Sequence, residues 1–423
     1  MLKRLAMQNM KLKHGGIKLN YKDKEKNKII NKDTLFSDYI EEVSRNVNIK
    51  EGKNSIEKIL VDVYFKEGIS TKELARNNFL PIPLITAIKR EFIKCGLLIQ
   101  DRGVRLTVMG RDYIENELGF KGLNKELYKK LLLEPWKDHK EIIEIKDEIN
   151  EIFINRPQAD VTIDQSKCTV DTAIKRAVLA LINRALISKK ILCVGDDDLV
   201  SIAISFLLKK LFADIRNCKT SVLVMDIDER ILSYIKSWGE KEGLPISCEH
   251  IDFRRPIANK LKNSFDCFFT DPPYTLQGMN LFVSRGLQAL KKENGIPIFL
   301  SYAHKSPDCD LAMQKCFIEM GLMVSEIIPT FNNYEGAAII GNTGQMIILK
   351  TTSESRPLIE EDYKDTIYTG ELNVTVRYYE CKQCGKIIKV GVSESFKTIE
   401  DLKGNGCSSC RGKLFKMLER AKV

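Results

Sequence analysis

The middle of the chain alternates between short apolar runs and longer segments in which apolar residues recur at helical spacing. The short runs predict buried strands, and the periodic segments predict amphipathic helices. This alternation is typical of an α/β fold with a mostly parallel sheet. The expected elements are strand 191–194, helix 199–211, strand 221–225, helix 229–238, strands 247–251 and 265–270, helix 279–290, strand 297–302, helix 308–320, and strands 323–328 and 345–349.

Seven strands that close with an antiparallel pair are the layout of the Rossmann fold of S-adenosylmethionine-dependent transferases. We therefore expect an α/β protein with an S-adenosylmethionine-transferase-type Rossmann domain at residues 166–365. Before the first strand, an amphipathic helix at 170–187 presents Ile174, Val178 and Leu181 on one face.

The segment upstream has a different pattern. Helical spacing from Ile56, a capped start at Ser70 and a third helix at 82–95 are followed by two alternating runs at 96–107. Three helices and a hairpin predict an N-terminal winged helix at 51–118. It would either bind DNA through its third helix or serve packing and dimer contacts inside an enzyme, and we favour the second. Residues 1–50 are expected to be a mobile basic leader, and 119–165 a helical linker.

Composition narrows the class of protein. The 423 residues carry a formal net charge of +10, which usually suggests a polyanionic partner, but Lys-rich ends can account for it. Nucleic acid is therefore a less favoured partner. No apolar run is long enough for a transmembrane helix and no signal-peptide core follows the basic start, so we expect a cytoplasmic protein without membrane contact. Separately, we expect the protein to form a homodimer.

Twelve cysteines fall into two groups. Eight are scattered through apolar elements and are predicted to be buried thiols. The other four form the Cys-x-x-Cys pairs Cys381/Cys384 and Cys407/Cys410. Two such turns can present four thiolates to one ion, and that ligand set selects zinc. We expect a C-terminal zinc ribbon at 366–423, with a hairpin sheet between the pairs and a structural zinc that the small module needs to fold.

The first strand of the Rossmann domain ends in Gly195-Asp196-Asp197-Asp198. Ligands of doubly wound sheets bind at this edge, where a glycine-rich loop usually holds the carboxylate of the cofactor. Acidic side chains there repel a carboxylate and attract an ammonium group. The nearest downstream cations, Lys209 and Lys210, are a helix away. The missing cation is therefore predicted to be the ligand, decarboxylated S-adenosylmethionine.

Other acidic residues follow the next two strands. Asp226 is the better candidate for holding the ribose hydroxyls, and Asp228 is the weaker one because it can simply open the next helix. Asp252 lies where adenine contacts are usual, with a turn aspartate as the alternative. Gly195 completes the predicted cofactor-binding set.

Asp271-Pro272-Pro273-Tyr274 follows the fourth strand of the sheet. Two prolines fix the backbone so that a carboxylate and an aromatic ring face one small space. Asp271 can accept a hydrogen from an amine, and the Tyr274 ring can stabilise a cation by ~0.5–2 kcal/mol. A rigid turn without chemistry is the alternative. His304 and Tyr334 are further candidates for substrate contact, against a structural histidine and a plain connection.

Two amine-modifying activities fit these motifs. An S-adenosylmethionine-dependent amino-methyltransferase would grip the exocyclic amine of a flipped base in nucleic acid. The acidic loop suits neither a carboxylated cofactor nor a phosphate backbone, so an aliphatic polyamine is the favoured acceptor. A regulator that senses such a ligand through its winged helix is a third hypothesis.

Together, Gly195-Asp196-Asp197-Asp198-Leu199, the segment 225–230 and the segment 269–275 resemble the branched-chain polyamine synthases, or N4-bis(aminopropyl)spermidine synthases. The resemblance extends through Arg156-Pro157, Asp164-Gln165, His304-Lys305 and 334–337, and so covers roughly residues 55–350.

This resemblance implies that aminopropyl groups move from decarboxylated S-adenosylmethionine to the central nitrogen of spermidine, twice in succession, with release of methylthioadenosine. It also implies that an aspartate of the acidic loop lies beside the attacking nitrogen, for which we choose Asp197. We expect Asp197, with Asp196 and Asp198, to bind and deprotonate the amine, while Asp271 and Tyr274 close the amine channel.

Overall fold

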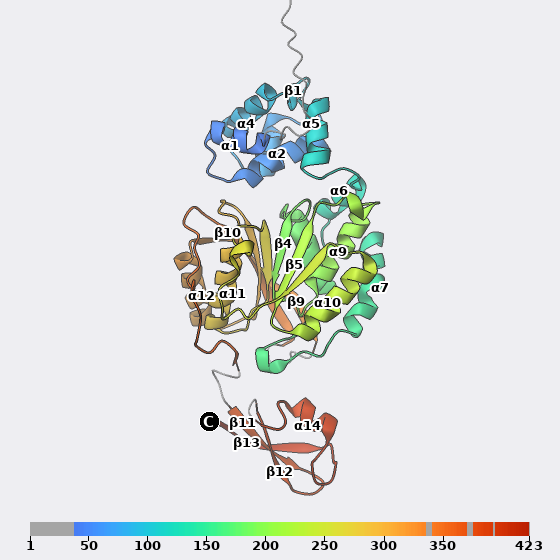
Figure 1. The fold of residues 1–423 in the computed structure, drawn as a ribbon, viewed down its shortest axis with the longest axis vertical. Helices are drawn as coiled ribbons and strands as arrows, with labels where there is room; N and C mark the ends of the chain where they lie inside the picture. The colour runs from blue at the N-terminus through green and yellow to red at the C-terminus, as the bar shows by residue number, and fades with distance from the viewer. Residues whose placement is uncertain (1–37, 336–340, 370–374, 392–393, 423) are drawn as a thin grey trace, which may run out of the picture. The chain divides into compact units, whose positions relative to one another are not determined.

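The computed structural model describes residues 38–335, 341–369, 375–391 and 394–422, and Figure 1 labels its elements. Of the predicted leader, residues 1–37 lie outside the described residues, and α1 (Tyr39–Val47) follows directly. None of the described helices is long and apolar enough to cross a membrane.

Three helices and a hairpin form in the predicted order after α1. Ser70 caps the second of them by accepting a hydrogen bond from the backbone N–H of Glu73. Whether this arrangement is a winged helix, and whether it ends at residue 118, stay predictions. The elements are α2 (Lys53–Phe65), α3 (Thr71–Asn78), α4 (Ile82–Lys94), β1 (Leu98–Gln100) and β2 (Val104–Leu106).

The predicted linker is helical. Within residues 119–165 it contains α6 (Lys125–Leu133) and α7 (Lys140–Ile154), whereas α5 (Val108–Asp112) and a short π-helix (Tyr113–Glu117) lie before it, in the segment predicted as the winged helix. Ile142, Ile145 and Ile149 of α7 recur at helical spacing and are buried, and α7 packs against α8 (Val170–Ile182) and α9 (Val200–Leu211).

The central sheet has the strand order β3-β9-β10-β8-β7-β4-β5-β6. Strands β6, β5, β4, β7 and β8 are parallel, β10 and β9 close the sheet antiparallel, and β3 adds a short edge. This is the predicted seven-strand layout, confirmed, with two added residues at β3. The strands are β3 (Lys167–Cys168), β4 (Lys190–Val194), β5 (Ser221–Asp226), β6 (Ile246–His250), β7 (Cys267–Thr270), β8 (Pro297–Tyr302), β9 (Leu322–Glu335) and β10 (Thr343–Thr351).

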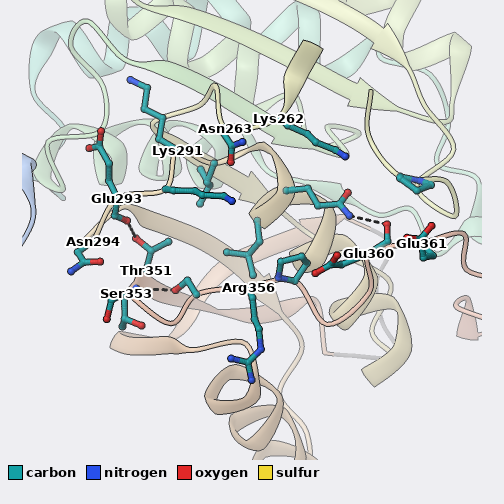
Figure 2. Close-up of a pocket in the computed structure, with 18 residues that line it drawn as sticks. Lys262, Asn263, Lys291, Glu293, Asn294, Thr351, Ser353, Arg356, Glu360 and Glu361 are labelled. Carbon is teal, nitrogen blue, oxygen red and sulfur yellow. Dashed lines mark hydrogen bonds between the residues drawn. The ribbon is translucent and has the colours of Figure 1, made fainter. Parts of the chain in front are cut away.

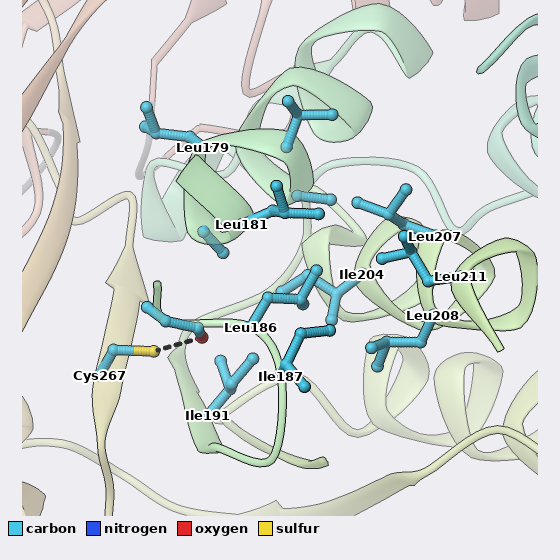
Figure 3. Packing of buried hydrophobic residues seen from close by; sticks show 14 of the residues in the cluster. Leu179, Leu181, Leu186, Ile187, Ile191, Ile204, Leu207, Leu208, Leu211 and Cys267 are labelled. Atoms are coloured by element: carbon cyan, nitrogen blue, oxygen red, sulfur yellow. Dashed lines mark hydrogen bonds between the residues drawn. The ribbon is translucent and has the colours of Figure 1, made fainter. Parts of the chain in front are cut away.

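Alternate residues of each strand face different helices. Ile191 and Cys193 belong to the core on the side of α8 and α9, where Leu181 and Ile204 lie close to β4 (Figure 3). Leu192 and Val194 belong to the core that includes α11 (Leu276–Ala289) and α12 (Pro307–Glu319). Because helices cover both faces of the sheet, the sequences of its parallel strands are continuous apolar runs. Helix α10 (Glu229–Glu242) packs beside β5 and β6.

The order of the strands reverses at β4, between β5 and β7. Val194, the last residue of β4, pairs with Met225 on one side and with Thr270 on the other. The loops that follow these three strands therefore meet at one edge, which is where ligands bind in open α/β sheets. These loops contain the three predicted acidic segments.

The C-terminal part has a small core of its own, made by Tyr379, Ile388, Val390 and Leu402 with two of the cysteines. Its sheet is β12-β11-β13, with β11 (Thr375–Cys381), β12 (Ile387–Val390) and β13 (Phe415–Lys422). The predicted hairpin sheet between the cysteine pairs is wrong, because that segment supplies one strand and the helix α14 (Ile399–Asn405).

The eight scattered cysteines are not all buried. Cys168, Cys193, Cys267 and Cys316 are, but Cys309, in the first turn of α12, is exposed. The remaining three, Cys95, Cys218 and Cys248, are partly buried.

Candidate active site

The acidic loop after β4 begins and ends with left-handed residues. Gly195 has φ 79° and Leu199 has φ 56°. Glycine adopts this conformation freely, whereas a buried leucine there is strained by roughly 1–3 kcal/mol. In this loop conformation, the side chains of Asp196, Asp197 and Asp198 contact three different sets of partners.

Asp196 faces the first turn of α9. Its carboxylate accepts hydrogen bonds from the backbone N–H groups of Val200, at 2.7 Å, and Ser201, at 3.2 Å. Burial raises the pKa of Asp196 to about 7, although these hydrogen bonds oppose the shift. Asp196 thus caps the start of a helix, and its carboxylate oxygens already have partners.

Asp198 is buried and contacts β3 and α8, which both precede it in the chain. One of its oxygens accepts from the backbone N–H of Cys168, at 2.7 Å, and the other from Nη1 of Arg176, at 2.6 Å. Burial alone would raise the pKa of Asp198, but the Arg176 guanidinium, together with Asp271, Arg156 and the backbone N–H of Cys168, holds that pKa below its usual range. Asp198 is therefore an ionised partner of Arg176.

Asp197 differs from both neighbours. One carboxylate oxygen accepts from the backbone N–H of Ser166, at 3.0 Å, and the other has no hydrogen-bond donor among the described residues. Burial raises the pKa of Asp197 well above its usual range, and the carboxylates of Asp198, Asp226 and Asp271 raise it further. Of the acidic loop, Asp197 is the carboxylate with an oxygen left for a ligand.

Arg176 was not predicted from the sequence. It lies on α8 and is 2% exposed, and its guanidinium reaches both Asp198 and Asp271. The expectation that the ligand alone supplies the counter-charge is therefore corrected, because a distant helix supplies part of it. The available signal was an arginine on a helix face of small residues, since Ala173 and Ala180 share its side at helical spacing.

Asp271 follows β7 and uses one oxygen twice. Its Oδ2 accepts from Nη2 of Arg176, at 3.0 Å, and from the hydroxyl of Tyr334, at 2.6 Å. Burial raises the pKa of Asp271 to about 7, with Asp198 raising it further and Arg176 opposing. The structure thus brings Asp271 and Tyr334 together, and their contact with substrate stays a prediction.

Tyr274 packs its ring edge-on against Tyr302, with centroids 5.3 Å apart. Its hydroxyl is buried and has no hydrogen-bond partner among the described residues. Burial and the nearby Asp271 raise the pKa of this hydroxyl well above its usual range, so it stays protonated. Pro272 and Pro273 before it are buried, and the carbonyl of Pro273 accepts from Thr275.

Asp226, at the end of β5, connects two loops. One oxygen accepts from the backbone N–H of Asp196 and the other from that of Asp228, both at 2.9 Å. Burial raises its pKa. Its Oδ2 also lies 4.0 Å from the position where a side chain on Gly195 would begin, so the two residues are neighbours, and their contact with a cofactor stays a prediction.

Three further candidates have local partners. Asp228 caps α10 and binds Nη2 of Arg230 at 2.6 Å. Asp252 accepts from the backbone N–H of Arg254, as the turn alternative predicted. His304 is exposed, and its Nε2 accepts from the backbone N–H of Thr330 at 3.3 Å.

A small cavity joins several of these groups. Gly195, the three aspartates of the acidic loop, Arg176 and Asp271 line it. A larger groove, of about 620 Å³, lies elsewhere (Figure 2). Its residues come from the opposite edge of the sheet, before β7 and β8 and after β10, and cations such as Lys262 alternate with acids such as Glu360. It contains none of the predicted site residues.

The four cysteines of the two Cys-x-x-Cys pairs come together, with sulfur atoms all within 4.8 Å of one another. Cys381 and Cys410 sulfurs are 3.5 Å apart, and Cys384 and Cys407 sulfurs 3.6 Å. Tetrahedral zinc with Zn–S bonds of about 2.3 Å would set its sulfurs about 3.8 Å apart. Backbone N–H groups of Ser409 and Cys410 lower the pKa of Cys407 to about 6. The cluster can therefore hold a metal ion.

Comparison with known proteins identifies the family of this chain. The family model described as the branched-chain polyamine synthase A C-terminal domain matches residues 144–403, more than half of the chain. The chain belongs to the branched-chain polyamine synthase family. This confirms the resemblance inferred from the acidic loop and its companion motifs, and with it an enzyme of the aminopropyltransferase class.

Relatives in this family cover different lengths of the chain. An uncharacterized protein of Methanocaldococcus jannaschii is 39% identical over 93% of this chain and 96% of its own length. The N(4)-bis(aminopropyl)spermidine synthase of the same organism is 30% identical over 65% of this chain and 79% of its own. That of Thermus thermophilus is 32% identical over 43% and 50%.

A solved structure shows a more distant likeness. The Thermus thermophilus branched-chain polyamine synthase, crystallised with N4-aminopropylspermidine and 5′-methylthioadenosine, is 22% identical, with a TM-score of 0.47 over 78% of this chain and 96% of its own. The family assignment rests on the family model and on the sequence relatives.

Proposed function

We propose that this protein transfers aminopropyl groups from decarboxylated S-adenosylmethionine to the secondary amine of spermidine, giving N4-branched polyamines and methylthioadenosine. Relatives named N(4)-bis(aminopropyl)spermidine synthase support the polyamine as acceptor. The arrangement of buried carboxylates supports a co-substrate that is cationic at the transferred end.

The observation that carries the proposal is the surplus of buried negative charge around Asp197. Asp198, Asp226 and Asp271 all raise the pKa of Asp197, while Arg176 hydrogen bonds to Asp198 and Asp271 but not to Asp197. Opposite charge within a few ångströms relieves such a surplus most where water is excluded. A polyamine and an aminopropyl sulfonium both supply that charge, whereas a methyl donor adds a carboxylate to it.

The remaining residues fit roles around this centre. Asp226 and Gly195 would hold the ribose side of the co-substrate, with Asp228 and Asp252 in the loops beside them. Asp271, Pro272, Pro273 and Tyr274 would line the amine channel together with Tyr334, with His304 at its exposed side. Since Asp196 caps α9 and Asp198 pairs with Arg176, their roles in catalysis would be to support Asp197.

The chemistry needs one proton acceptor beside the amine. Asp197 would take a proton from the secondary ammonium of spermidine, so that the nitrogen lone pair attacks the carbon next to sulfur. A C–N bond forms as the C–S bond breaks, and its electrons neutralise the sulfonium to give the thioether methylthioadenosine. The resulting tertiary ammonium loses a proton in the same way before a second transfer. A positioned general base contributes about 10²–10⁴-fold.

We propose a structural zinc at Cys381, Cys384, Cys407 and Cys410. The donor set and the sulfur spacing fit this ion, and the six-residue core of the ribbon is small for a module that folds without a metal. All residues proposed for aminopropyl transfer lie outside the ribbon. The homodimer, the winged helix and the cytoplasmic location stay predictions.

Mass spectrometry of products tests the proposed function. The purified protein is incubated with spermidine and either S-adenosylmethionine or its decarboxylated form. We expect one and then two aminopropyl additions with the decarboxylated form alone. Methylation of spermidine or of nucleic acid would instead support the amino-methyltransferase, and calorimetric uptake of S-adenosylmethionine with indifference to its decarboxylated form would overturn the proposal.

A further inference from the structure

Among the described residues, Arg176 is the only cation that hydrogen bonds to the carboxylate cluster, defined as Asp196, Asp197, Asp198, Asp226 and Asp271. It approaches from α8, a helix outside the three loops that supply the cluster. Its side chain is almost fully buried. Burying a guanidinium is costly unless every donor finds an acceptor, so its partners define what it does.

The fork of the guanidinium joins two carboxylates that belong to different loops. Nη1 binds Asp198, and Nη2 binds Asp271 and the hydroxyl of Tyr334. A planar fork with fixed donors can bridge two carboxylates in one geometry, which a lysine ammonium does not reproduce. The loops after β4 and β7 are thereby held at a set separation.

The orientation of the fork is itself fixed by β9. Nε of Arg176 donates to the side-chain oxygen of Asn332, at 2.9 Å, and the amide of Asn332 donates in turn to the carbonyl of Gln345 on β10. Asn332 is fully buried. The antiparallel end of the sheet thus determines the direction from which Arg176 binds the two carboxylates.

These contacts divide the oxygens of the cluster. Both oxygens of Asp198 are used, by Cys168 and Arg176. Asp271 uses Oδ2 for Arg176 and Tyr334, while its Oδ1 has no donor among the described residues. Asp197 likewise keeps one oxygen, so the network leaves one free oxygen on each of two carboxylates from neighbouring loops.

We infer that Arg176 is a positioning residue for aminopropyl transfer, which binds Asp198 and one oxygen of Asp271 so that the other Asp271 oxygen and Asp197 are left for the nitrogens of the polyamine. This inference rests on the proposed function. It assigns Asp198 to the support of the site and makes Asp271 and Asp197 the pair that contacts the acceptor.

The position of the Arg176 guanidinium beside Asp271 affects how the rate of aminopropyl transfer depends on pH. Removing the guanidinium removes the cation that opposes the raised pKa of Asp271, so the acidic limb of activity moves to higher pH. The titratable and charged groups that face Asp271 or share its surroundings are Arg176 and Cys168 near α8, Asp197 and Asp198 in the acidic loop, Tyr334 on β9, and Tyr274 on its own segment.

The test compares Arg176→Gln and Arg176→Lys with the wild type in the aminopropyl assay, over a range of pH. For Arg176→Gln we expect kcat to fall about 10²-fold, since misplaced catalytic groups cost on this order, and the acidic limb to move upward. For Arg176→Lys, which keeps the charge but not the fork, we expect the limb to stay near that of the wild type while kcat still falls. Lys175→Gln, one residue away on α8 and partly exposed, is the matched control and should keep the wild-type kcat and the wild-type acidic limb.

A double variant separates positioning from folding. Arg176→Gln with Asp198→Asn removes the buried charges together, so the melting temperature should recover toward the wild type while kcat stays low. Recovery of kcat in the double variant, or a wild-type kcat in Arg176→Lys, would reduce Arg176 to a structural ion pair and overturn the inference. An inactive wild type would overturn the proposed function as well, so the two failures are distinguished.

Discussion

The carboxylate cluster and the cysteine cluster both gather like-charged groups, but they balance the charge differently. The aspartates use donors that the protein itself supplies, which are the N–H groups of α9, the backbone at Ser166 and Cys168, and Arg176. The cysteines receive backbone N–H groups from Ser409 and Gly412, and among the described residues no lysine or arginine side chain hydrogen bonds to their sulfur atoms. In the proposed function, the partly balanced first cluster leaves room for a cationic substrate, whereas the second can hold a metal ion.

The largest expected effect on the reaction comes from Asp197→Asn. It removes the proposed base, so the rate should fall by about 10²–10⁴-fold. It should not lower the melting temperature, because it relieves repulsion from three neighbouring carboxylates. Asp214→Asn, at a partly exposed aspartate paired with Arg216, is the matched control and should leave the rate unchanged. A rate for Asp197→Asn close to that of the control would remove Asp197 from the mechanism.

Next comes Asp198→Asn, whose effect should appear in stability. It leaves the buried Arg176 without its shortest ion pair, and breaking a buried pair on one side costs about 3–5 kcal/mol. Urea unfolding followed by circular dichroism measures this loss. If Asp198→Asn and Asp197→Asn changed the free energy of unfolding alike, the two carboxylates would not have the different surroundings described for them.

A smaller effect concerns pH and ligand together. Burial raises the pKa values of Asp196 and Asp271 to about 7, above an unfolded value of about 3.9. A raised carboxyl pKa means that the stability of the unliganded protein falls as pH rises from about 4 to about 7. Spermidine, with amines that stay protonated there, binds the ionised form, so the rise in melting temperature that it causes should be larger at pH 8 than at pH 6.

Thermal melts with and without spermidine across this range check the prediction. Asp271→Asn removes one of the two carboxyl groups whose pKa is about 7 and should flatten the pH dependence of the ligand effect. A ligand effect that is constant, or that decreases toward pH 8, would show that the cluster is not the polyamine site.

The smallest effect on the reaction should come from the other cluster. Cys407→Ser removes one thiolate, so zinc measured by plasma mass spectrometry should fall from one per chain and residues 375–422 should become sensitive to protease. The rate of aminopropyl transfer should change far less than in Asp197→Asn, since the proposed site residues lie elsewhere. Loss of the rate in proportion to zinc would instead tie the ribbon to catalysis.

The two clusters also differ in how far the sequence predicts them. All four cysteines lie in two Cys-x-x-Cys turns, so their spacing alone predicts the cluster that forms. The alternation of strands and helices likewise predicts the sheet, because its parallel strands are buried on both faces.

The aspartates at the ends of β4, β5 and β7 are predicted for the same reason, since parallel strands bring their carboxyl ends to one edge. The side chains that bind these aspartates are not predicted by the sequence. Arg176 is on a helix that precedes the parallel strands, and Asn332 is on the antiparallel strand β9. Their contacts depend on tertiary packing and not on local spacing, which is why the source of the counter-charge was missed.

Asp226 holds the backbone of two loops with its two oxygens, that of Asp196 after β4 and that of Asp228 after β5. Neither loop can be exchanged for one from a methyl-transferring enzyme without disturbing the other. A change in which sulfonium donor the protein prefers, in the laboratory or by natural selection, would therefore require that the loops after β4 and β5 be replaced together.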